Sequence, residues 1–236
     1  MLYDKDIREA LFEFLDDMYG KNRILEEKRI RKSRADVVMV TPEAIYGIEI
    51  KSDADTYARL EKQVRDYNLF YDYNYVVVGS SHAHHIEEHV PKTWGIITVE
   101  EIEGNADFYV MRKPLPNTRM RWKRKLSILW RPELAHIQEL NHMYKYKEKS
   151  KDFVIDKILE KVPKEVLQGQ ICEELFQRDY TTIEEVIKEY KENNRRSSKN
   201  TKSARNTKSA RNTKSVRNAK SAGNTKTTKK YKTAKK

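Results

Sequence analysis

Two carboxylates and a lysine are placed at the ends of two short apolar runs. Glu49 and Lys51 flank Ile50 at the end of one run, and Asp36 opens the other. Because side chains alternate between the faces of a strand, Glu49 and Lys51 share one face and Ile50 points to the other. The turn between the runs is short, so a hairpin would bring Asp36 and Glu49 together. Two carboxylates and an ammonium group suit metal-assisted phosphodiester cleavage, because oxygen ligands hold a hard divalent ion that orients or activates water.

Three motifs follow one another along the chain. They are Arg34-Ala35-Asp36, Glu49-Ile50-Lys51 and Gln63-Val64-Arg65-Asp66-Tyr67. Together they resemble the PD-(D/E)XK nuclease superfamily, whose pattern is an Asp on one strand, E-x-K on a second strand and often Gln-x-x-x-Tyr on the next helix. Residues 47–53 also resemble a small bacterial family of nuclease-like proteins of unknown function. The resemblance covers roughly residues 4–100, and Ala35 replaces the usual proline.

The resemblance implies a fold and an activity. The fold would be α/β, with a restriction-endonuclease-like αβββαβ core built on a mixed sheet. The activity would be Mg²⁺-dependent hydrolysis of DNA phosphodiester bonds, with Mn²⁺ as a substitute ion, in DNA repair, a mobile element or defence. The alternative is a catalytically silent nucleic-acid-binding module, or an interaction protein, on the same fold. DNA is preferred as the partner by analogy with relatives of this fold.

The expected roles differ between the residues of the site. Asp36 and Glu49 would be metal ligands, with the carbonyl of Ile50 as a third. Lys51 would orient the attacking water or stabilise charge on the scissile phosphate. The alternative is a plain salt bridge between Glu49 and Lys51 at the end of a strand, because E-x-K alone is a common chance pattern.

Further residues of the site come from two helices. Gln63 and Tyr67 are four apart and therefore neighbours on one helix face. The resemblance places this pair toward the metal or the substrate phosphate. Superfamily members often add an acid from the first helix. Glu9 is the preferred candidate here, and the other acids that remain open are Glu13 on the same helix and Glu26 and Glu27 on the first strand.

Hydrophobic periodicity predicts the elements that must position these residues. Apolar residues at helical spacing indicate a first helix over residues 4–19, and Gly20 follows as a stop. The expected order is α-β-β-β-α-β with a further αβ unit, which is the core order of the superfamily. In residue numbers, the expected strands are 23–30, 37–40, 46–50, 75–79 and 94–99, the second helix is 56–71, and a short helical stretch surrounds Ile86.

The chain divides into four expected parts. These are a nuclease-like domain at 1–112, a basic aromatic linker at 113–130, a helical segment at 131–194 and a tail at 195–236. Around the linker, basic residues alternate with Tyr109, Trp122 and Trp130, a composition that could hold phosphates and stack on bases. The alternative is a solvated linker whose tryptophans anchor the next helix. The basic residues are Arg112, Lys113, Arg119, Arg121, Lys123, Arg124 and Lys125.

The tail carries the basic character of the chain. Residues 195–236 hold 16 Lys or Arg and no Asp or Glu, so the first 194 residues hold 48 − 16 = 32 basic and 36 acidic residues, a net charge of −4. The hexad at 202–207 recurs at 208–213 and then degrades. This apolar-poor composition predicts disorder. The tail is either a non-specific nucleic-acid tether or a tolerated simple-sequence expansion.

Composition also bounds the location. Cys172 is the single cysteine, so no intrachain disulfide can form, and its apolar surroundings in the sequence indicate a core residue rather than a nucleophile. The chain has no apolar run of membrane-spanning length, and its acidic N-terminal residues argue against a signal peptide. We therefore expect a cytoplasmic protein without a membrane partner.

Overall fold

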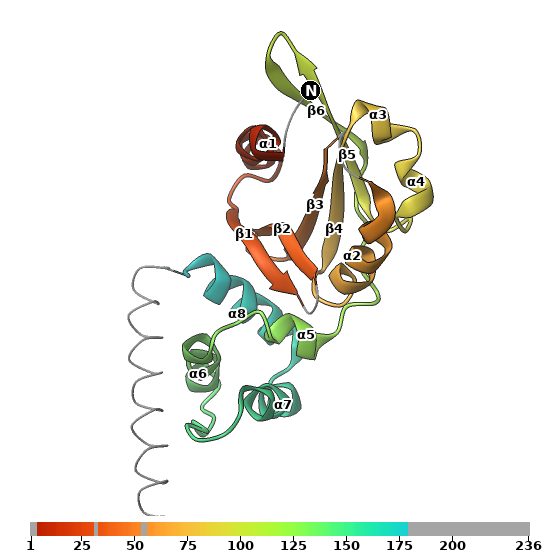
Figure 1. Cartoon of the computed structure of the whole chain (residues 1–236). Helices are drawn as coiled ribbons and strands as arrows, with labels where there is room; N and C mark the ends of the chain where they lie inside the picture. The colour runs from red at the N-terminus through yellow and green to blue at the C-terminus, as the bar shows by residue number, and fades with distance from the viewer. Residues whose placement is uncertain (1–3, 31–32, 53–55, 179–236) are drawn as a thin grey trace, which may run out of the picture. The chain divides into compact units, whose positions relative to one another are not determined.

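A computed structural model describes residues 4–30, 33–52 and 56–178 of the chain (Figure 1). The predicted tail and the last part of the predicted helical segment, residues 179–194, lie outside the described residues. The helices are α1 (Asp4–Tyr19), α2 (Leu60–Tyr67), α3 (Ser80–Ala83), α4 (Ile86–His89), α5 (Trp122–Leu126), α6 (Arg131–Leu140), α7 (Lys151–Lys161) and α8 (Lys164–Phe176), with a 3₁₀ turn, η1, at Tyr57–Arg59. The strands are β1 (Arg23–Ile30), β2 (Ser33–Val40), β3 (Ile45–Lys51), β4 (Tyr73–Gly79), β5 (Gly95–Ile102) and β6 (Asn105–Arg112).

The described residues form one six-stranded mixed sheet in chain order, β1-β2-β3-β4-β5-β6. β1, β2 and β3 pair antiparallel, β3, β4 and β5 pair parallel, and β6 returns antiparallel to β5. A parallel pair needs a crossover, which η1 and α2 supply between β3 and β4. The predicted α/β fold with a mixed sheet is confirmed. β6 was not predicted, and the predicted helix at 56–71 is a 3₁₀ turn followed by a shorter α-helix.

The two faces of the sheet are covered by different helices (Figure 1). Ile7, Leu11 and Leu15 of α1 are buried in one apolar cluster with Ile48 and Ile50 of β3. The opposite cluster contains Leu60, Val64 and Tyr67 of α2. Glu49 and Lys51 therefore lie on the α2 face, as strand alternation predicted.

Gly47 explains how closely α2 approaches the sheet. A Cβ atom at this position would lie 2.1 Å from the ring of Tyr71 and 2.7 Å from the ring of Tyr67. Both separations are far below van der Waals contact, so only glycine leaves room for the two tyrosines against β3. This close contact brings the Tyr67 hydroxyl within reach of Glu49, the residue two positions further along β3.

Helices α5 to α8 share the buried cluster of the α2 face. Leu126 of α5, Leu134 of α6, Ile155 of α7 and Leu167 of α8 are all fully buried within it. Pro132 occupies the first turn of α6, as predicted. Apolar packing thus links the part of the helical segment that is described to the sheet.

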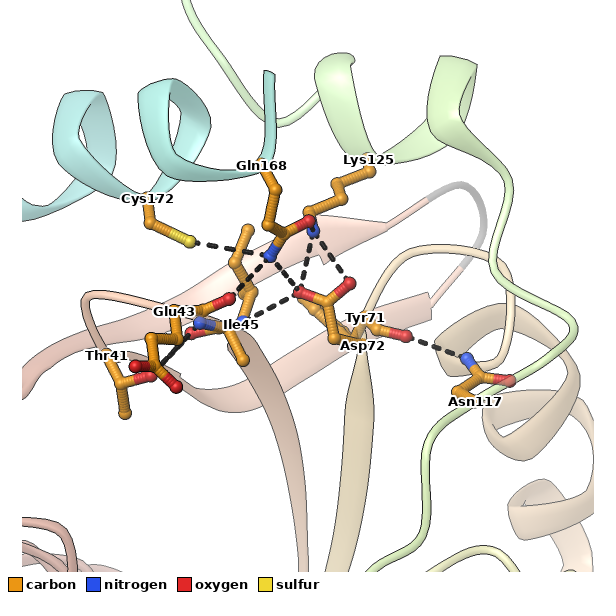
Figure 2. A network of polar contacts seen from close by, with 10 residues as sticks. Thr41, Glu43, Ile45, Tyr71, Asp72, Asn117, Lys125, Gln168 and Cys172 are labelled. Carbon is orange, nitrogen blue, oxygen red and sulfur yellow. Dashed lines mark hydrogen bonds and ion pairs between the residues drawn. The ribbon is translucent and has the colours of Figure 1, made fainter. Parts of the chain in front are cut away.

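A buried polar network joins two of these helices to the sheet (Figure 2). The Lys125 side chain of α5 is fully buried, and its Nζ donates to both carboxylate oxygens of Asp72 at 2.7 and 2.6 Å and to the side-chain oxygen of Gln168 in α8. Gln168 donates to the carbonyl of Glu43 at 2.8 Å, and the Ile45 amide donates to Asp72 at 2.9 Å. Burial lowers the pKa of Lys125, while the charge of Asp72 opposes that shift.

We expect Lys125→Met to lower the free energy of unfolding by about 3 kcal/mol, because removing one partner of a buried pair leaves the other charge uncompensated. Urea denaturation of the full-length chain measures this value. Lys123→Met is the matched control, because Lys123 pairs with Asp156 at 2.6 Å with both side chains about half exposed. The control should change stability by less than about 1 kcal/mol. Equal changes in the free energy of unfolding for the two variants would contradict a stabilising role of the buried Lys125–Asp72 pair.

Candidate active site

Glu49 is the centre of the candidate site. It lies near the end of β3 and has no exposed surface. Its Oε1 accepts hydrogen bonds from Lys51 Nζ at 2.7 Å and from Gln63 Nε2, and its Oε2 accepts from the Tyr67 hydroxyl at 2.7 Å. Four of the residues predicted from the sequence are therefore in direct contact.

Asp36 joins this group where two strands separate. The pairing of β2 with β3 ends at Val37 opposite Ile48, one residue after Asp36. Beyond that point a side-chain contact takes the place of backbone pairing between β2 and β3. The Asp36 Oδ2 accepts a hydrogen bond from the backbone N–H of Ile50 at 3.0 Å. The backbone N–H of Asp36 donates to the Tyr67 hydroxyl at 3.2 Å. Tyr67 thus connects Asp36 and Glu49 through one oxygen atom.

The electrostatics of Glu49 reflect burial beside a like charge. Burial, and next the charge of Asp36, raise the pKa of Glu49 to about 7 against the opposing effects of Lys51 and Tyr67. Burial and the charges of Glu49 and Asp36 raise the pKa of Tyr67, so its phenol stays protonated as a donor. Strongly perturbed pKa values arise from such arrangements and are concentrated at functional sites.

The donor set fits a hard divalent cation. Besides the carboxylates of Asp36 and Glu49, the side-chain oxygen of Gln63 is buried and accepts no hydrogen bond within the described structure. Carboxylate and amide oxygens are the ligand type that Mg²⁺ and Ca²⁺ prefer. No cluster of three or more His, Cys, Asp or Glu side chains suited to a metal occurs in the described part of the chain. A cation held here would draw its remaining ligands from neutral oxygens, such as the predicted Ile50 carbonyl, and from water.

The structure places a basic residue of α1, rather than an acid, at Asp36. Glu9 and Glu13 are exposed. Arg8 is 12% exposed, and its Nη2 lies 3.8 Å from Asp36 Oδ1. Glu26 of β1 approaches the same guanidinium, at 3.6 Å from Nη1.

Sequence reasoning missed Arg8, although helical geometry carried a signal for it. Residues advance by about 100° each around a helix. Ile7, Leu11 and Leu15 mark the buried face of α1. Arg8 borders that face on this count, whereas Glu9 falls on the opposite side of the helix.

The basic aromatic residues are divided between the packed interior and the surface. Trp122 packs against the buried cluster of the α2 face, and the Arg178 guanidinium lies 4.2 Å from the centre of the Trp130 ring. Lys125 is buried, and Arg112 donates to the carbonyl oxygens of Trp94 and Pro91. These contacts match the alternative in which the tryptophans anchor the following helices. The other members are exposed on the surface, namely Tyr109, Lys113, Arg119, Arg121, Lys123 and Arg124.

Cys172 is a core residue, as predicted. It is fully buried, and burial raises the pKa of its thiol to about 11. A thiol of this kind is protonated at neutral pH and is a poor nucleophile.

Among the described residues, no helix combines the length and the apolar character needed to cross a membrane.

Comparison with solved structures finds SfsA of Pyrococcus furiosus, solved in complex with Ca²⁺. The two chains are 12% identical, the match covers 48% of this chain and 60% of that chain, and the TM-score is 0.28. No curated protein matches the sequence. The family model described as Bacteriophage P4 protein cII matches residues 1–206, which is most of the chain. This protein therefore belongs to the Bacteriophage P4 protein cII family.

Proposed function

We propose that this protein is a metal-dependent nuclease that hydrolyses DNA phosphodiester bonds. The observation that carries the proposal is the buried Glu49 carboxylate, bound by Lys51, Gln63 and Tyr67 next to Asp36. These five residues come from three motifs spread over 32 positions (67 − 36 + 1 = 32), in the order that the nuclease resemblance expects.

The residues of the site have separate tasks in this proposal. Asp36 and Glu49 hold Mg²⁺, or Mn²⁺ in its place, and the side-chain oxygen of Gln63 and the Ile50 carbonyl are available as further ligands. The bound ion supplies the Lewis acidity that activates water or the phosphate. Lys51 offers its ammonium group to the attacking water or to the charge that builds on the scissile phosphate. Tyr67 holds one oxygen of Glu49, which fixes the direction of the carboxylate.

The contacts argue against a purely structural salt bridge. A Glu49–Lys51 pair needs no second carboxylate, yet the charge of Asp36 raises the pKa of Glu49 and so works against the ionised pair. A structural pair also gives no reason for a buried amide oxygen on Gln63 without a donor. Both features disfavour the metal-free site, and a bound cation would relieve both.

One assay tests the proposed function. The purified full-length chain is incubated with linear, circular, nicked and single-stranded DNA in Mg²⁺, Mn²⁺ or chelator. Cleavage that requires metal supports the nuclease, and the Glu49→Gln protein, purified in parallel, excludes a contaminating enzyme.

The complete burial of Glu49 favours a second candidate, a binding module that does not cut. Binding of DNA without cleavage of any substrate would support that module.

We also propose that the protein acts in the cytoplasm on nucleic acid, and the basic tail offers a test of this partner. If residues 195–236 neutralise roughly eight phosphates, DNA affinity should fall by about 10³ to 10⁵ between 50 and 200 mM salt. Deleting the tail should flatten that dependence and leave the melting temperature nearly unchanged. Fluorescence anisotropy with a labelled duplex over a salt series measures the slope. An unchanged slope would show that the tail does not contact DNA.

A further inference from the structure

The guanidinium of Arg8 lies between a carboxylate of the site and the molecular surface. Nη2 is 3.8 Å from Asp36 Oδ1, and Nη1 is 3.4 Å from the Asp36 carbonyl oxygen. Nη1 is also 3.6 Å from Glu26 Oε2. The exposed fraction rises from 18% for the Asp36 side chain to 54% for that of Glu26. Arg8 therefore reaches from the buried site toward solvent.

In the metal-free protein each carboxylate of the site faces a cation. Lys51 faces Glu49 at 2.7 Å, and Arg8 faces Asp36. A divalent cation held by Asp36 and Glu49 would add two positive charges beside both cations. Repulsion would then weaken the contact of Arg8 with Asp36, whereas a DNA phosphate at the metal would bring a new negative charge within reach.

We propose that Arg8 is a phosphate-binding residue of this site, and the proposal rests on the nuclease function proposed above. In the metal-free protein, Arg8 serves as the counter-ion of Asp36. When a metal takes Asp36, the guanidinium pairs with non-bridging oxygens of the DNA phosphate. Arginine suits this exchange because its planar fork binds carboxylate and phosphate in the same bidentate geometry and its charge does not titrate.

A structural role for Arg8 makes a different prediction. Arg8 could act only as a clamp that joins α1 to β2 and holds Asp36 in place. Loss of such a clamp would misplace Asp36 and weaken metal binding. Loss of a counter-ion would instead remove positive charge next to the metal and strengthen metal binding. The sign of the change in metal affinity therefore separates the two roles.

The test compares Arg8→Gln and Arg8→Lys with the wild-type chain at full length. Arg65→Gln is the matched control, because Arg65 lies on the surface of α2, 68% exposed, and pairs with Glu61 at 3.4 Å. Isothermal titration calorimetry measures Mg²⁺ affinity without DNA. Fluorescence anisotropy measures the affinity for a DNA duplex in Ca²⁺ over a salt series, after the duplex has been shown to remain intact. Thermal melting confirms that each variant is folded.

We expect Arg8→Gln to bind Mg²⁺ more tightly than the wild type and to bind DNA about tenfold more weakly, as the loss of one charged hydrogen-bonding group predicts. Its salt slope should be shallower by about one phosphate contact. Arg8→Lys should keep the slope, because it keeps the charge. Arg65→Gln should match the wild type in Mg²⁺ affinity.

Weaker Mg²⁺ binding by Arg8→Gln with an unchanged DNA salt slope would overturn the phosphate role and leave Arg8 as a clamp. If the wild-type chain cleaves DNA and Arg8→Gln shows weaker Mg²⁺ binding with an unchanged salt slope, the Arg8 inference fails and the proposed nuclease function stands. A wild-type chain that neither binds Mg²⁺ nor cleaves DNA would overturn the proposed function, and the Arg8 inference with it.

Discussion

Glu49→Gln should abolish metal-dependent DNA cleavage while the protein remains folded. Glutamine is nearly isosteric with glutamate but lacks the charge that a divalent ion requires. Burial and the charge of Asp36 raise the pKa of Glu49 to about 7, so both effects disfavour its charge in the metal-free protein. Removing that charge relieves these two effects but leaves the buried ammonium of Lys51 without its partner, so we expect a lower melting temperature for a chain that still folds. Isothermal titration calorimetry should show weakened Mg²⁺ binding, and gel-based cleavage assays should show no product.

Glu61→Gln is the matched control for this substitution. Glu61 lies on α2 with its side chain 84% exposed, so the same chemical change there should leave both metal binding and cleavage intact. Circular dichroism and thermal melting of both variants separate a loss of activity from a loss of fold. A Glu49→Gln protein that cuts DNA at nearly the wild-type rate would show that the active-site assignment is wrong.

Lys51→Ala should lower the cleavage rate on the order of 10² to 10³, the usual cost of losing one preorganised charged contact in a transition state. Unlike Glu49→Gln, it should still bind Mg²⁺, because both carboxylates remain. Lys51 lowers the pKa of Glu49, so its removal raises that pKa. The two proteins are therefore compared over a pH series, which separates a loss of ionised Glu49 from a slower chemical step, and single-turnover kinetics should locate the remaining loss in the chemical step.

Lys62→Ala provides the control for this prediction. Lys62 is exposed on α2, next to Gln63, and its loss should not change the single-turnover rate. If Lys51→Ala also cleaves at nearly the wild-type rate, the Glu49–Lys51 contact is a salt bridge, and the nuclease proposal loses its cationic group.

Much of the candidate site could be predicted because it depends on local regularities of the chain. Strand alternation put Glu49 and Lys51 on one face and Ile50 on the other, and the structure agrees. The short hairpin between β2 and β3 brought Asp36 to the Ile50 amide. Helical spacing put Gln63 and Tyr67 on one side of α2, where both contact Glu49. Each of these relations spans one or two neighbouring elements and follows from backbone geometry.

β6 escaped prediction because its pattern resembles a solvated segment. In β6, only Ala106, Phe108 and Val110 pack against the apolar cluster that α1 forms with the sheet, and they are partly rather than fully buried. On the other face Tyr109 is 71% exposed and Met111 is 46% exposed. An edge strand with one weakly buried face shows little contrast between its two faces, and the basic residues that follow it suggested a linker.

The sequence by itself determined the order of the strands from β1 to β5, the two faces of β3 and the grouping of Asp36, Glu49, Lys51, Gln63 and Tyr67. The tertiary structure decided which charges meet across long separations. The basic aromatic composition left open whether Lys125 holds phosphate, but Lys125 is buried against Asp72, 53 positions away in the chain. Arg8, not Glu9, reaches Asp36, 28 positions away. Hydrophobic and motif patterns depend on residues that are close in the sequence. The burial of a charge depends on a partner that tertiary packing brings from far along the chain.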